Sequence, residues 1–257
     1  MTTLTIPPHT KDSTPAKRVL SRQAAVVAGI SYLALFVVAI FANFFVLEGL
    51  IEAGDATTTA ANIRESEGLF RTGLVGFLAI VILDIVIAWA LHIIFKPLDR
   101  DLSLLTAWFR LIYSTLLAVA TIFFFLALEV ISGANYLTAF TADQLDSQAL
   151  AYLDAFNVTW LIGLLMFGIH LVLLGYMILR TGITNRALGY ILMLAGAGYI
   201  IDTGAHALLG NYDDYETLFG LIVAIPSVIG ELSIGLWLLL RAGKEHPSQD
   251  SPTELAN

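Results

Sequence analysis

Six long apolar segments dominate this chain and decide what it can fold into. Each is about 20 residues or longer, the length that an α-helix needs to cross the hydrocarbon core of a bilayer. They cover residues 24–47, 69–95, 108–132, 156–179, 187–209 and 218–240. Charged residues make up only 13% of the chain, against about 25% in ordinary soluble domains. The sequence therefore predicts an all-α integral membrane protein, a six-transmembrane-helix bundle over residues 23–241.

The basic residues predict the orientation of the bundle. They gather before the first segment, after the second, between the fourth and fifth, and after the sixth, all on one side: Lys11, Lys17, Arg18, Arg22, Lys96, Arg100, Arg180, Arg186, Arg241 and Lys244. The opposite side carries only Arg64 and Arg71. By the positive-inside rule, both termini are expected in the cytoplasm. The polar tails 1–22 and 242–257 have a composition that cannot bury a core, so both are expected to be disordered.

Composition also excludes several classes of function. The chain has no cysteine, which removes disulfides, thiolate chemistry and cysteine-ligated metals. Its few basic residues follow the topology and form no patch, so no nucleic-acid partner is expected. The partners left are the lipid bilayer and, as candidates, a lipid or a small cation; the pattern specifies no oligomeric state.

Ionisable side chains inside the apolar segments are the residues most relevant to function, because each is costly in hydrocarbon. At about 1.5 Å per residue, Asp84, His170 and Glu231 fall within about 5 Å of the midplane and Asp202 about 6 Å beyond it. His206 and Glu129 lie roughly 12 Å toward the outer end, whereas His92 and Arg110 lie roughly 15 Å toward the inner end. We therefore expect a polar midplane site of five residues: Asp84, His170, Asp202, His206 and Glu231.

Two local patterns support this site. Asp202 and His206 are four residues apart, so they share one face of a helix and could bond or chelate the same ion. Ser227 similarly precedes Glu231 by one turn, just after the helix-kinking Pro226. Ser227, Glu129, His92 and Arg110 are accessory candidates; for the last three, anchoring at the membrane interface is an alternative.

Three interpretations of the midplane site remain open. The first, and leading, one is a proton or cation relay in a transporter-like protein. The second is a divalent metal such as Zn held by His170, Asp202, His206 and Glu231 in an intramembrane hydrolase that acts on lipid-like substrates. The third is a structural or partner-binding subunit. No residue is assigned as catalytic. Neither haem nor retinal is expected, because His170 and His206 differ in depth by roughly 15 Å and no lysine lies within a span.

Two other patterns concern the backbone. Glycines recur every seven residues at Gly168, Gly175, Gly182, Gly189 and Gly196, but the series crosses a predicted loop and is treated as a coincidence. Residues 57–68 contain no helix breaker and are expected to form a surface helix, with Thr59 as one candidate cap.

Several segments resemble an uncharacterised prokaryotic multi-pass membrane family, domain-of-unknown-function family 4386. The resemblance lies in residues 62–71, 109–111, 167–176, 188–196, 230–232 and 236–238, of which the segments around His170 and Glu231 are the most specific. It covers about residues 22–241. It implies a protein of the prokaryotic cytoplasmic (inner) membrane and brings no assigned activity.

Overall fold

The computed structural model describes residues 20–133 and 135–243, and within them six helices are long and apolar enough to span a membrane. The predicted six-helix architecture is therefore confirmed. The spans are formed by α1 (Arg22–Ile40) with its extension to Leu50, α4 (Glu67–Phe95), α5 (Arg100–Ile131), α6 (Ala142–Thr181), α7 (Arg186–Leu208) and α8 (Glu216–Leu240). Apart from residues 20–22 and 242–243, the predicted tails lie outside the described residues.

Shorter elements connect the spans. The first span continues through η1 (Phe41–Leu47), a π-helical stretch, and α2 (Glu48–Leu50), while η2 (Asn135–Ala139) precedes α6 and η3 (Tyr212–Tyr215) precedes α8. The helix expected within 57–68 is α3 (Ala56–Glu65). The proposed cap was wrong: Asp55 caps α3, accepting hydrogen bonds from the Thr58 amide at 2.9 Å and the Thr58 hydroxyl at 2.7 Å. Thr59 is buried and bonds to the backbone of Glu52 instead.

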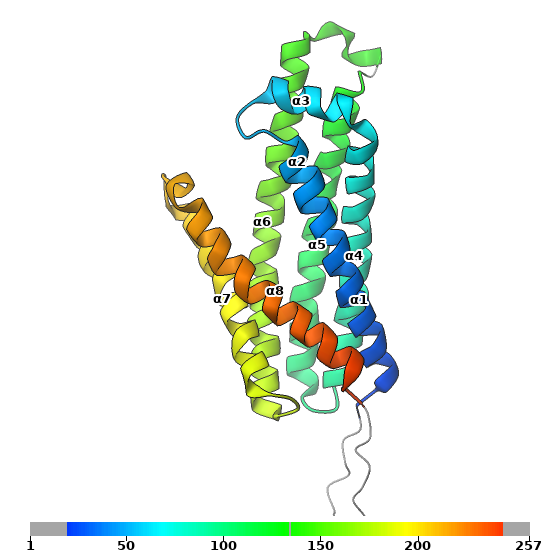
Figure 1. The fold of residues 1–257 in the computed structure, drawn as a ribbon, viewed down its shortest axis with the longest axis vertical. Helices are drawn as coiled ribbons and strands as arrows, with labels where there is room; N and C mark the ends of the chain where they lie inside the picture. The colour runs from blue at the N-terminus through cyan, green and yellow to red at the C-terminus, as the bar shows by residue number, and fades with distance from the viewer. Residues whose placement is uncertain (1–19, 134, 244–257) are drawn as a thin grey trace, which may run out of the picture.

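The six spans form a ring in chain order. Each packs against the next along the chain, and α8 returns to pack against α1. Arg22 closes the ring by capping the C-terminal end of α8, since its guanidinium donates to the carbonyls of Leu238, Leu239 and Ala242. The N-terminus of α1 and the C-terminus of α8 therefore meet at one end of the bundle, here called the terminal end, while α3 lies at the other, the α3 end (Figure 1).

The glycine series is a packing device centred on the turn between α6 and α7, so its treatment as a coincidence was wrong. Gly182 ends α6 with a left-handed φ of 63°, a conformation that glycine adopts without strain. Seven residues to either side, Gly175 faces Gly189; fourteen to either side, Gly168 faces Gly196. A Cβ atom on Gly175 would lie 2.5 Å from the Gly189 carbonyl oxygen. The equal spacing therefore lets the two backbones of this hairpin touch twice.

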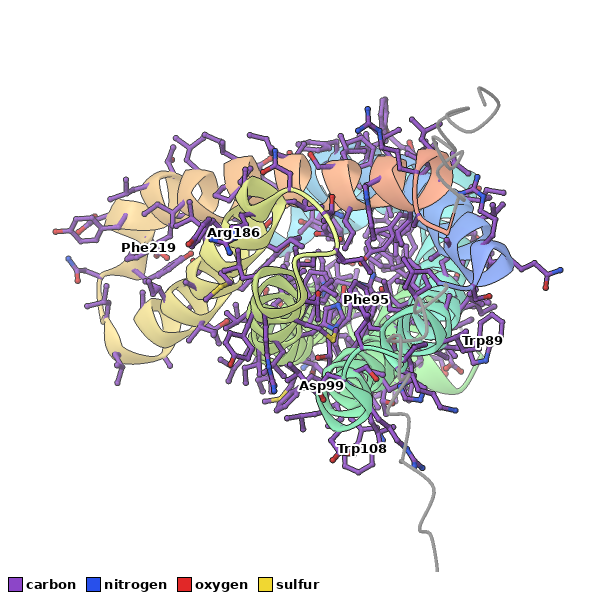
Figure 2. The ribbon with its side chains drawn as sticks, turned by 90° about the horizontal axis from the view of Figure 1, so that it is seen from below. Trp89, Phe95, Asp99, Trp108, Arg186 and Phe219 are labelled. Atoms are coloured by element: carbon purple, nitrogen blue, oxygen red, sulfur yellow. The ribbon has the colours of Figure 1, made fainter. Side chains whose placement is uncertain are left out.

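Aromatic side chains fill the interior toward the α3 end. Phe70, Phe77, Phe124 and Phe156 are fully buried and stack or tilt against one another between α4, α5 and α6. At the terminal end Trp89 and Trp108 instead point outward and are about half exposed (Figure 2), as interfacial anchors do. Between the aromatic packing and the terminal end, the ring surrounds a polar centre.

Candidate functional site in the centre of the ring

Arg110 is the centre of the polar cluster and is completely buried. Its Nη2 donates to Asp84 Oδ1 at 2.5 Å, and its Nη1 lies 3.0 Å from the Tyr32 hydroxyl and 3.2 Å from His170 Nε2. These partners come from α4, α1 and α6, while Arg110 belongs to α5. One guanidinium thus joins four of the six spans. The charge of Asp84 balances that of Arg110, and the remaining partners supply neutral acceptors.

The hydrogen bonds of His170 define its tautomer. Its Nδ1 lies 2.9 Å from the carbonyl oxygen of Thr106, which can only accept, so Nδ1 carries the proton. Nε2 then accepts from Arg110. This arrangement requires a neutral imidazole, and it leaves neither ring nitrogen free for a metal ion.

Two aromatic rings complete the surroundings of Arg110. The guanidinium carbon lies 5.0 Å from the centroid of Tyr32 and 5.2 Å from that of Phe167. At these distances the faces of the rings attract the cation. The buried charge is consequently held by one carboxylate, two neutral acceptors and two π-systems.

The cluster forms because its members lie at equal distances from the terminal end. Tyr32 and Arg110 lie ten residues after the starts of their helices, at Arg22 and Arg100, and Asp84 lies eleven residues before the end of α4 at Phe95. At 1.5 Å per residue, each is about 15 Å from that end. The prediction that Arg110 lies much closer than Asp84 to the inner end of the bundle was therefore wrong. It followed from a third span beginning at residue 108, whereas α5 begins eight residues earlier.

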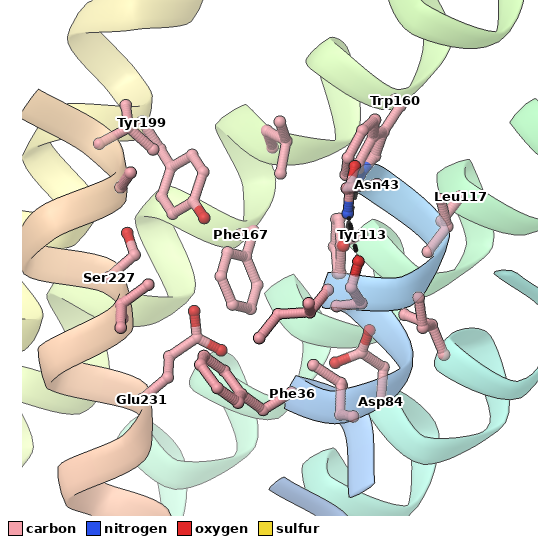
Figure 3. Close-up of a pocket in the computed structure, with 18 of the residues that line it drawn as sticks. Phe36, Asn43, Asp84, Tyr113, Leu117, Trp160, Phe167, Tyr199, Ser227 and Glu231 are labelled. Atoms are coloured by element: carbon pink, nitrogen blue, oxygen red, sulfur yellow. Dashed lines mark hydrogen bonds between the residues drawn. The ribbon is translucent and has the colours of Figure 1, made fainter. Parts of the chain in front are cut away.

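A cavity of about 350 Å³ adjoins the cluster and is lined by side chains from all six spans. Asp84 lies on one side of it, and Glu231 and Ser227 project into it from α8 on the other (Figure 3). Arg110 also lines it, beside Asp84. Tyr113, Trp160, Phe167 and Tyr199 provide the aromatic wall from α5, α6 and α7. The cavity combines a mostly apolar wall with a few converging polar groups, which is typical of sites for small ligands.

Glu231 differs from Asp84 in having no direct partner among the described residues. Asp84 is held by Arg110, whereas within residues 20–133 and 135–243 no hydrogen bond or ion pair joins Glu231 to another side chain. Its carboxyl group is partly buried at the wall of the cavity. Glu231 is thus the acidic group of this site that remains available to a ligand.

The cavity opens sideways between α8 and the extended first span. The residues at this opening that line the cavity and are also exposed are Ile40, Phe44 and Glu48 on one side and Ala224 and Val228 on the other. Toward the α3 end, α7 and α8 lean away from the remaining helices (Figure 1). The opening is therefore on the flank of the bundle, in the half toward α3.

Asp202 and His206 lie outside this site. The Tyr212 hydroxyl donates to Asp202 at 2.7 Å, and the His206 ring packs against the Tyr212 ring with centroids 4.1 Å apart. Both interactions are local, between α7 and the η3 turn that follows it. The expectation that these two residues extend the midplane site is corrected: the structure brings together Asp84, Arg110 and His170, with Glu231 across the same cavity.

The remaining sequence candidates have separate positions. His92 Nδ1 lies 3.0 Å from the Ser103 hydroxyl, between α4 and α5 near the terminal end. Glu129 is exposed near the end of α5. In the described part of the chain no three His, Asp or Glu side chains come together closely enough to hold a metal ion. The metal set predicted from His170, Asp202, His206 and Glu231 is therefore not assembled.

Sequence reasoning missed the tyrosines of the site. Tyr32 binds Arg110, and Tyr113 and Tyr199 line the cavity. None carries a charge, so none is conspicuous in an apolar segment. Only the position of Tyr32 along its helix indicated its role. Tyr32 is as far from the start of α1 as Arg110 is from the start of α5.

Comparison with known proteins agrees with the architecture. A family model described as a domain of unknown function, DUF4386, matches residues 27–242. A protein of Archaeoglobus fulgidus named "Uncharacterized protein" is 28% identical over 171 residues, which is 66% of this chain and 84% of the archaeal one. No solved structure matches. The family match includes five spans completely, most of the first span and every residue that lines the central cavity, and the chain belongs to the DUF4386 family.

Proposed function

We propose that this protein is a cation-handling, transporter-like protein of a prokaryotic cytoplasmic membrane, in which Glu231 binds the cation or exchanges it for a proton. The observation that carries the proposal is the division of roles between two carboxyl groups in one cavity. Asp84 is neutralised by Arg110, while Glu231 lines the cavity and has no hydrogen-bond or ion-pair partner among the described residues. A carboxyl group held this way within a membrane is costly unless a proton or a cation accompanies it.

The Arg110 cluster has a supporting role in this proposal. Its three polar partners and two aromatic rings bind four spans together, and among the described residues Asp84 Oδ2 and Arg110 Nε are left without a hydrogen-bond partner. Because the charges of Asp84 and Arg110 compensate each other, this network has no net charge that would attract a cation. Glu231 then supplies the charge that selects a cation.

The movable element of a transport cycle would be the α7–α8 pair. Pro226 lies inside α8 beside the cavity-lining residues Ser227 and Ala224. Proline removes the hydrogen bond to the carbonyl four residues earlier, so helices bend at such positions. A bend at Pro226 would alter the opening while leaving the contact of α8 with α1 at the terminal end in place.

The proposal is tested by cation binding to the purified protein in lipid nanodiscs. Calorimetric titration with butylammonium, sodium and potassium is compared among the wild type, Glu231→Gln and Glu216→Gln. Glu216 is the matched control, because it lies on the same helix but is exposed. We expect at least one cation to bind the wild type and the Glu216 variant, with at least tenfold weaker binding to Glu231→Gln. Equal binding to all three proteins, or no binding to the wild type, would contradict the proposal.

A further inference from the structure

We infer that the ligand of the central cavity is an amphipathic amine, one ammonium group on a hydrocarbon chain, which reaches Glu231 sideways from the lipid bilayer between α8 and the π-helical part of the first span. The inference rests on the proposed function and specifies its ligand and route. It is carried by the position of the opening, the character of the cavity walls and the charge at the deep end.

The opening faces hydrocarbon. Phe44 and Ile40 on one side are 58% and 38% exposed, and Val228 on the other is 43% exposed. Each also lines the cavity, so one apolar surface continues from the flank of the bundle into its interior. Such a surface favours a hydrocarbon chain and offers no groups to replace the water shell of an inorganic ion.

The first span is irregular at this opening. Residues Phe41–Leu47 form the π-helical stretch η1, and the Asn43 side-chain amide donates to the Ala39 carbonyl at 2.9 Å. Asn43, Phe44 and Ala39 all line the cavity. Wide helical turns of this kind frequently occur at functional sites. Here the irregular turn forms one side of the lateral opening.

Polar groups lie at both ends of the apolar passage. Glu231 and Ser227 are at the inner end, and Glu48 is exposed at the outer end. Between them the wall is formed largely by Leu35, Ala39 and other apolar side chains. An ammonium group can therefore be attracted at the rim and neutralised at Glu231, with its chain along the wall.

The charges also define what the cavity disfavours. Asp84 and Arg110 compensate each other, so Glu231 sets the sign of the site. A phosphate-bearing lipid would bring an anion toward this carboxyl group, which opposes binding when both are ionised. A single-chain amine meets no such opposition. The site thus favours a single-chain amine over an anionic phospholipid.

The test uses photoaffinity labelling in nanodiscs with a hexadecylamine that carries a diazirine in mid-chain. Labelling should map to the cavity-facing residues of the first span and α8, and Glu231→Gln should reduce it at least tenfold. Ala224→Trp, which narrows the opening, should slow labelling at least tenfold. The matched control is Ile225→Trp, because Ile225 is the next residue on α8, is 55% exposed and does not line the cavity; its labelling rate should equal that of the wild type.

Binding of water-soluble butylammonium separates the route from the site. Ile225→Trp, at a residue that does not line the cavity, should keep this binding, which shows that a tryptophan at this part of α8 leaves the protein folded and Glu231 able to bind. A second variant, Phe44→Ala, widens the opening and should accelerate labelling by the long-chain probe. Unchanged labelling rates in both Ala224→Trp and Phe44→Ala, with Glu231 still required, would overturn the lateral route while leaving the proposed function standing. Labelling that does not depend on Glu231 would overturn both.

Discussion

Replacing Asp84 with asparagine should destabilise the bundle by about 3 kcal/mol, because the change leaves the guanidinium of Arg110 charged among neutral groups. Asp84 supplies the one anionic oxygen that the guanidinium contacts, at 2.5 Å. A single charged side chain at the centre of a membrane helix costs about 2.5–3.5 kcal/mol. A hydrogen bond between spans contributes only about 0.6 kcal/mol on average. The uncompensated charge of Arg110 therefore determines the loss of stability, and the hydrogen bond that asparagine can still accept does not offset that loss.

Removing both charges should recover much of this loss. In the double variant Asp84→Leu with Arg110→Met, no uncompensated charge remains, and an apolar pair can fill the buried space. The two residues are in contact, so their effects should not add. The free energy of unfolding of the double variant is expected to exceed that of Asp84→Asn by about 1–2 kcal/mol.

These free energies can be measured by equilibrium unfolding with a denaturing detergent in bicelles, followed by tryptophan fluorescence. The control is Glu67→Gln, which breaks the Arg71–Glu67 pair, whose side chains are 55% and 42% exposed. An exposed pair of this type contributes about 0–1 kcal/mol. If Asp84→Asn loses no more than this control, or if the double variant is less stable than the single one, the description of Arg110 and Asp84 as mutually dependent buried charges is refuted.

Three further outcomes are expected. Gly175→Ala should lower the melting temperature because its methyl group would meet the facing backbone of α7, whereas Gly204→Ala, with nothing within 4 Å, should leave it unchanged or raise it. Hydrogen bonds that Asp55 accepts from the first turn of α3, chiefly from a backbone amide, hold its pKa below the ordinary value. The stability that ionised Asp55 gives to α3 is therefore present at neutral pH and is lost as the pH falls through that lowered pKa. Hydrogen exchange should show α3 losing protection in acid in the wild type, and already at neutral pH in Asp55→Ala. A cysteine at the exposed Ser147 should be labelled from outside intact cells by an impermeant thiol reagent, and one at Ser13 should not, since the chain has no other cysteine; the reverse pattern would invert the predicted topology.

The spans could be predicted from sequence because a membrane imposes a length on every helix that crosses it. Four of the six apolar segments fall within spanning helices, and the other two extend one residue past theirs, at Ser132 and Leu209. Their ends were harder to predict, because helices continue past the hydrocarbon where polar residues are tolerated. Depth was measured from the centre of each span, so the earlier start of α5 brings Arg110 from roughly 15 Å to about 8 Å from that centre. The late predicted start of this helix explains why Arg110, the central cation of the cluster, was expected near the inner interface of the membrane.

Contacts between spans could not be derived from depth alone. Asp202 and Asp84 were expected near one level, yet Asp202 binds Tyr212 in the following turn, whereas Asp84 meets Arg110. Depth gives one coordinate of a side chain, and the direction in which it points around its helix decides its partner. For the α6–α7 hairpin, the glycines do indicate which faces of the two helices meet. Glycines at equal distances in sequence on either side of Gly182 face each other. Reading such a series about its turn would have aligned these two helices from sequence.

The arrangement of the two carboxyl groups explains how a polar centre can be both stable and available. If Asp84 were as free as Glu231, two buried carboxyl groups would share one cavity, and repulsion would oppose the ionisation of both. Arg110 prevents this by taking Asp84 into a network whose partners come from four helices. The network fixes the floor of the cavity and cancels its charge, so that the charge state of the cavity depends mainly on Glu231. A cation or a proton that arrives there changes this charge without disturbing the contacts that hold the ring of helices together.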